Sequence, residues 1–123
     1  FSLRTYPVAA VDYLESRGLV ARPDVRVVSE DFVGNYLELR FGEDANAYVD
    51  DRPDARTLLD YRALRLMEPD WQEALYRADA DVVVFQTGRE FTDAVAGLPD
   101  WTKVTARGDY TVLCRDRVLD RCR

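Results

Sequence analysis

The stretch VRVVSEDFVGNYLELRFGEDANAYVDDRPD, from Val25 to Asp54, carries the strongest fold signals in the chain. Its β-branched start, Val25 to Val28, predicts a short buried strand. Asp31 suits the N-cap of a helix that ends before Gly42, and Ala47 to Asp50 predicts a second strand. The stretch therefore predicts a strand, a helix and a strand in succession, which is typical of an α/β fold.

Helices and strands also alternate on both sides of this stretch. Val82 to Phe85 is an uninterrupted apolar run, typical of a central parallel strand covered on both faces. Arg107, Gly108 and Asp109 indicate a hairpin turn between two further strands. The remaining predicted segments are helices at Pro7 to Arg17, at Asp54 to Pro69, at Asp70 to Ala78 and at Arg89 to Ala96, and strands at Trp101 to Ala106 and at Tyr110 to Arg115.

This order of segments predicts one α/β domain that covers residues 1–123. We expect a three-layer, Rossmann-like fold with a mixed sheet of about five strands. The first three strands are expected to be parallel, and the C-terminal hairpin antiparallel. The chain begins at Phe1 rather than at Met, which predicts a processed protein or an excised fragment.

Composition narrows the classes of partner and of chemistry. The formal net charge is -6, and an acidic surface repels the phosphates of nucleic acid, so we expect no nucleic-acid partner. The chain has no histidine, the side chain most often used for proton transfer at neutral pH. This lowers the expectation of an autonomous enzyme but leaves carboxylate chemistry open, and we assign no catalytic residue.

Cys114 and Cys122 lie near the end of the chain and leave two interpretations open. In an oxidising compartment they could form a disulfide that ties the C-terminus to the last strand, with a stabilisation of about 2 to 3 kcal/mol. Alternatively they are independent thiols, Cys114 buried in a strand and Cys122 in a loose tail. Two thiolates without histidine leave zinc short of ligands, so we expect neither a metal nor another cofactor.

Polar side chains follow the predicted parallel strands, where open α/β sheets bind ligands. The functional interpretation is a site for a polar or cationic ligand, or for a divalent metal held by oxygens. In the alternative, Asp31 and Asp54 cap helices, Glu30 or Asp51 pairs with Arg52, and the other side chains are solvated. The candidate site residues are Glu30, Asp31, Gly34, Asn35, Asp50, Asp51, Arg52, Gln86 and Thr87.

Five segments of the chain, taken together, resemble a known family. They are YPVAAVDYLESRGL (Tyr6 to Leu19), RVVSEDFVGNYLELRF (Arg26 to Phe41), AYVDDRPD (Ala47 to Asp54), DWQEALYRADADVVVF (Asp70 to Phe85) and WTKVTARGDYTVLCR (Trp101 to Arg115). In this order they resemble the C-terminal soluble domain of multi-span bacterial membrane proteins. Those proteins are similar to the dolichyl-phosphate-mannose protein mannosyltransferases and to other lipid-linked-sugar glycosyltransferases of the C superfold.

Two motifs carry most of the resemblance. Pro7 to Leu14 matches the family's P-V-x-A-V-D-[FWY]-L helix, and Tyr48 to Arg52 matches its [FY]-[IV]-D-[GD]-R segment. The family's W-G-G-Y-L-like turn is altered, because Val33 replaces the tryptophan and Asn35 replaces one glycine.

The resemblance implies a location more than a reaction. It implies an accessory domain on the extracytoplasmic side of the cell membrane, after the last span of a glycosyltransferase-like protein. The implied partners are the membrane portion of the same polypeptide and a glycan or lipid-linked sugar. The family's catalytic acids lie in loops between membrane spans, so this domain is not expected to be catalytic alone.

Two other functions stay open. One is a free-standing carboxylate- or metal-dependent enzyme whose site uses Glu30, Asp31, Asp50 and Asp51. The other is a small cytosolic interaction module, which would be preferred if the two cysteines were far apart and reduced.

Overall fold

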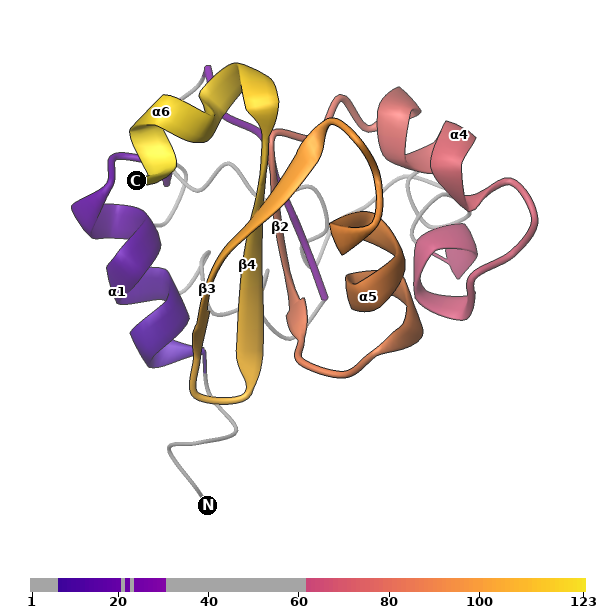
Figure 1. Ribbon diagram of the computed structural model, residues 1–123, viewed down its shortest axis with the longest axis horizontal. Helices are drawn as coiled ribbons and strands as arrows, with labels where there is room; N and C mark the ends of the chain where they lie inside the picture. Colours follow the sequence, from indigo (N-terminus) through magenta and orange to yellow (C-terminus); the bar gives the residue numbers. More distant parts are fainter. Residues whose placement is uncertain (1–6, 21, 23, 31–61) are drawn as a thin grey trace.

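The computed structural model describes residues 7–20, 22, 24–30 and 62–123, and these form a mixed four-stranded sheet with helices on both sides (Figure 1). The strand order is β1-β2-β4-β3. The strands are β1 (Val27–Ser29), β2 (Val82–Gln86), β3 (Trp101–Arg107) and β4 (Tyr110–Arg115).

Helices α1 (Val8–Ser16) and α6 (Leu119–Cys122) lie on one side of the sheet, and α4 (Trp71–Arg77) and α5 (Glu90–Ala96) lie on the other (Figure 1). Residues 62–66 are also helical, and a 3-10 turn, η3 (Asp116–Val118), leads from β4 into α6. Helix α1 ends before Gly18, whose φ of 66° lies in the left-handed region that glycine adopts without a steric penalty.

Strand β2 divides the core into two clusters of buried side chains. Val82 and Val84 belong to the cluster that includes side chains of α1 and α6. Val83 and Phe85 belong to the other cluster, with side chains of α4 and α5. Since successive side chains of a strand point to opposite faces, an uninterrupted apolar run is what a strand covered on both faces requires.

The C-terminal hairpin places β4 rather than β3 beside β2. Residues 110–114 of β4 are all buried, whereas every position of β3 after Trp101 is partly or fully exposed. The more apolar strand therefore takes the interior position, and β3, with the exposed side chains of Lys103 and Arg107, forms the edge. Gly108 permits the tight turn with its φ of 58°.

The α/β class, the parallel pair of β1 with β2 and the antiparallel hairpin are confirmed. The five-stranded, three-layer Rossmann-like arrangement is not, because the described residues form four strands with one parallel pair. The reason is that β4 returns antiparallel to β2 and occupies its second edge. The predicted strand from Ala47 to Asp50 and the helix from Asp31 lie outside the described residues.

Replacing Phe85 with alanine should lower the free energy of unfolding by about 3 to 5 kcal/mol, because it leaves a cavity where the ring packs 4.6 Å from that of Phe91, centroid to centroid. Leu66→Ala is the control, since Leu66 is 52% exposed and its replacement should change stability by less than about 0.5 kcal/mol. Chemical denaturation measures both. Equal losses for the two variants would show that β2 does not form the centre of the core.

Candidate functional site

The carboxyl ends of β1 and β2 bring a buried carboxylate against the sheet backbone. Glu30 directly follows β1 and is 8% exposed. Its Oε1 accepts a hydrogen bond of 2.6 Å from the backbone N–H of Gln86, the last residue of β2. Because β1 and β2 are parallel, both residues lie at the same end of the sheet, where these two strands finish.

The second oxygen of Glu30 pairs with an arginine. Nη2 of Arg89 lies 3.3 Å from Oε2 of Glu30, and Nε of Arg89 donates to the side-chain oxygen of Gln86 at 3.1 Å. Arg89 precedes the first residue of α5, and the Thr92 hydroxyl on that helix donates to the backbone oxygen of Gln86 at 2.8 Å. The buried charge therefore has both a cation and an N–H donor, as a buried carboxylate requires.

Residues at and just before the start of strand β4 also lie at this end of the sheet. The hydroxyls of Thr87 and Thr111 share a hydrogen bond of 2.7 Å, and the N–H of Thr87 donates to the backbone oxygen of Asp109 at 2.9 Å. Burial raises the pKa of Tyr110 to about 12, and the negative charges of Glu30 and Asp109 act in the same direction.

The structure thus brings together three of the predicted site residues, Glu30, Gln86 and Thr87. The other six, Asp31, Gly34, Asn35, Asp50, Asp51 and Arg52, lie outside the described residues. Arg89 was missed by the sequence reasoning, which named Arg52 as a partner for Glu30. The sequence does contain an indication of this pair. Arg89 stands three positions after Gln86, at the start of a predicted helix, and therefore close to the carboxyl end of the strand.

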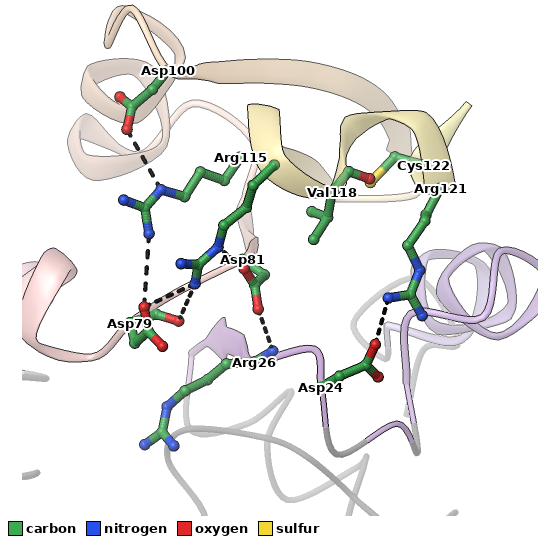
Figure 2. Close-up of polar contacts among 10 residues, drawn as sticks. Asp24, Arg26, Asp79, Asp81, Asp100, Arg115, Val118, Arg121 and Cys122 are labelled. Atoms are coloured by element: carbon green, nitrogen blue, oxygen red, sulfur yellow. Dashed lines mark hydrogen bonds and ion pairs between the residues drawn. The ribbon is translucent and has the colours of Figure 1, made fainter.

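The opposite end of β2 carries a second polar cluster (Figure 2). Asp81 immediately precedes β2 and is 4% exposed. It accepts a hydrogen bond of 2.9 Å from the backbone N–H of Arg26 and a further one from Nε of Arg117. Asp79 lies 2.8 Å from Nη2 of Arg117 and 3.8 Å from Nη1 of Arg115. The hydrogen bond from Arg117 lowers the pKa of the Asp79 carboxyl, and its positive charge acts in the same direction.

Arg115 extends this cluster to α4 and to the loop before β3. Its guanidinium lies 5.0 Å from the ring centroid of Tyr76, and its Nε is 3.6 Å from Oδ2 of Asp100. The Tyr76 hydroxyl donates to Asp100 at 2.8 Å. Burial raises the pKa of Tyr76, and this hydrogen bond, the second largest cause, acts in the same direction. Arg115 and Arg117 each pair with two carboxylates, and these ion pairs join segments of the chain.

Cys114 on β4 and Cys122 on α6 form a disulfide, one of the two alternatives that the sequence left open. Both residues are fully buried. Cys122 therefore lies in a packed helix and not in a loose tail.

Within the described ranges, no cluster of three or more histidine, cysteine, aspartate or glutamate side chains is placed to bind a metal. In the same part of the chain, none of the helices has both the length and the apolar character needed to cross a membrane.

Comparison with protein-family models finds no match, and comparisons with curated proteins and with solved structures find no significant similarity. The resemblance to the C-terminal domain of glycosyltransferase-like membrane proteins therefore stays a prediction.

The side chains of Glu30 and Arg89 should be strongly coupled, because Glu30 is buried and removal of Arg89 would leave its charge unpaired. In a double-mutant cycle of Glu30→Gln and Arg89→Gln, we expect a coupling energy of about 1 kcal/mol or more. The pair of Arg62 with Glu68 is a matched control, since both side chains are well exposed and their coupling should be below about 0.5 kcal/mol. Equal coupling energies would mean that Glu30 is solvated in solution.

Ionisation of Tyr110 should destabilise the fold at alkaline pH. Its pKa is near 10 in the unfolded chain and about 12 in the folded protein, so the stability linked to its neutral form is complete below pH 10 and is lost as the pH rises through about 12. Denaturation midpoints between about pH 9 and 12 should fall less in Tyr110→Phe than in the unmodified protein. Identical pH profiles would contradict this assignment.

Proposed function

We propose that this chain is an extracytoplasmic accessory domain of a glycosyltransferase-like integral membrane protein, and that it binds or positions an acceptor, a glycan or a partner without being catalytic alone. The observation that supports the proposal best is the buried disulfide between Cys114 and Cys122. Structural disulfides persist in oxidising compartments and are rare in the cytosol of mesophiles. The order of sequence segments that resembles the family is a second, independent support.

Two observations weigh against the other functions. A cytosolic interaction module was favoured only if the cysteines were far apart and reduced, and here they are bonded. A carboxylate enzyme would use Glu30 as an acid, a base or a metal ligand. Both oxygens of Glu30 are already engaged, one by a backbone N–H and the other by Arg89, so that chemistry would have to displace an ion pair.

We assign one surface to contact with the rest of the protein. It is the end of the sheet that carries Glu30, Gln86 and Thr87. Arg89 at this end is 44% exposed in its side chain, so it can bind a second acceptor while it neutralises Glu30. The proposed contacts are the membrane portion of the same polypeptide and a glycan or lipid-linked sugar. A three-layer, Rossmann-like arrangement with a fifth strand from Ala47 to Asp50 belongs to the same proposal.

The redox state of the cysteines in the native host tests the compartment. Cells expressing the full reading frame are quenched in acid, denatured and treated with a maleimide before and after reduction, and the peptides are identified by mass spectrometry. We expect Cys114 and Cys122 to be labelled only after reduction. Cys122→Ser is the control, because it leaves Cys114 as a thiol that must react without reduction. Labelling of both cysteines before reduction would contradict an extracytoplasmic location.

The reading frame itself tests the parent protein. We expect several membrane-spanning segments upstream of this domain. A reporter enzyme that works only outside the cytoplasm should be active when it is fused to the C-terminus of the domain. A parent without upstream spans would contradict the proposed function even if the disulfide were present.

A further inference from the structure

The last residues of the chain cover the disulfide. Residues 116–122, called the C-terminal segment here, consist of η3 and α6. Val118 is buried in the same cluster as both cysteines, and Leu119 packs against that cluster. Both cysteines have 0% exposed surface. A soluble thiol therefore cannot reach either sulfur while this segment is docked.

Polar contacts hold the C-terminal segment at several points (Figure 2). Arg117 bonds to the buried carboxylate of Asp81 and donates to the backbone oxygen of Asp79 at 3.1 Å. Arg121 donates to Asp24 at 2.9 Å and to the backbone oxygen of Gly18 at 3.0 Å. The segment is thus hydrogen-bonded to the residues just before β2 and to the connection between α1 and β1.

Helix α1 supplies a further contact. The Tyr13 hydroxyl donates to the backbone oxygen of Cys122 itself. The carbonyl groups at the end of a short helix otherwise lack partners, so this bond fixes the position of the residue that carries one of the two sulfurs.

Exchange chemistry requires access to sulfur. A thiolate attacks one sulfur of the disulfide, expels the other as a thiolate and forms a mixed disulfide, which a second thiol then resolves. With a dithiol reductant, the products are the thiols of Cys114 and Cys122 and the cyclic disulfide of the reductant. Formation of the bond runs through the same steps in reverse, with an oxidised dithiol as the acceptor of two electrons.

We propose that the C-terminal segment is a gate for thiol exchange: the Cys114–Cys122 disulfide forms and is reduced only while residues 116–121 have released their contacts with the rest of the domain. In the oxidised protein, Cys122 stays tethered to Cys114 in this open form. A disulfide-exchange partner therefore acts on an open form in which Arg117 and Arg121 have left their carboxylates. This inference does not depend on the proposed function. Opening the segment costs less than unfolding the sheet, because it exposes one short helix and leaves β1, β2, β3 and β4 paired.

The two arginines should contribute unequally to the closed form. The side chain of Asp81 is 6% exposed and that of Asp24 is 67% exposed. Loss of Arg117 leaves a buried carboxylate without its cation, whereas loss of Arg121 leaves a carboxylate in water. Arg117 is therefore expected to dominate the closure.

The test is the rate at which excess dithiothreitol reduces the folded protein, followed by alkylation and mass spectrometry. We expect Arg117→Gln to accelerate reduction by about tenfold or more, and Arg121→Gln to accelerate it less. Arg89→Gln is the matched control, because it also removes the cation from a buried carboxylate, that of Glu30, but at the opposite end of β2 from Asp81 and Arg117. We expect its reduction rate to stay within about twofold of the unmodified protein.

A second measurement needs no variant. In the unmodified protein, the reduction rate should rise only slightly with sub-denaturing urea, because opening a short segment exposes little surface. A urea dependence equal to that of global unfolding would overturn the proposal. Equal acceleration by Arg117→Gln and Arg89→Gln, or reduction as fast as in the unfolded chain, would also overturn it.

Discussion

Burial of β2 on both faces is the constraint on which the described structure depends. Val82 to Phe85 is fully buried, and no other described strand is paired on one side in parallel and on the other side antiparallel. A strand in this position needs apolar side chains on both faces and backbone partners on both edges. It therefore separates the α1 and α6 cluster from the α4 and α5 cluster and fixes the order of its neighbours.

Polar groups gather where this apolar strand ends. At its carboxyl end Gln86 meets Glu30, and at its amino end Asp81 meets Arg26 and Arg117. Both carboxylates are buried, so each needs an arginine and a backbone N–H. The two ends use these groups differently. Arg89 at the carboxyl end remains partly exposed, and we propose that a partner binds there, whereas Arg117 at the amino end holds the C-terminal segment over the disulfide.

Elements whose signal is local were predicted from the sequence. The run at Val82 to Phe85 and the turn at Gly108 each reflect a requirement of burial or of the backbone at that position. The order of the strands was not predicted, because it depends on the competition between β3 and β4 for the edge of β2. The polar composition of β3 and the more apolar composition of β4 contain that information, but only when the two strands are compared.

The same reason separates the predicted site residues from the observed contacts. Glu30, Gln86 and Thr87 come together by the rule for parallel strand ends, which requires that the first and third predicted strands be neighbours, as β1 and β2 are. The ion pairs of Glu30 with Arg89 and of Asp81 with Arg117 join residues far apart in the sequence. Charged residues make up 33% of the chain, so the sequence offers many alternative partners for each carboxylate and does not select one. The packing of α5 and of the C-terminal segment makes that selection.

Native-state hydrogen exchange of the β2 amides tests most directly whether β2 is the centre of the fold. We expect the amides of Val83 and Phe85 to exchange only through global unfolding, with the full dependence on denaturant. The amides of the C-terminal segment should exchange through a smaller opening of lower free energy. The contradicting result would be exchange at Val83 and Phe85 through an opening of lower free energy than global unfolding.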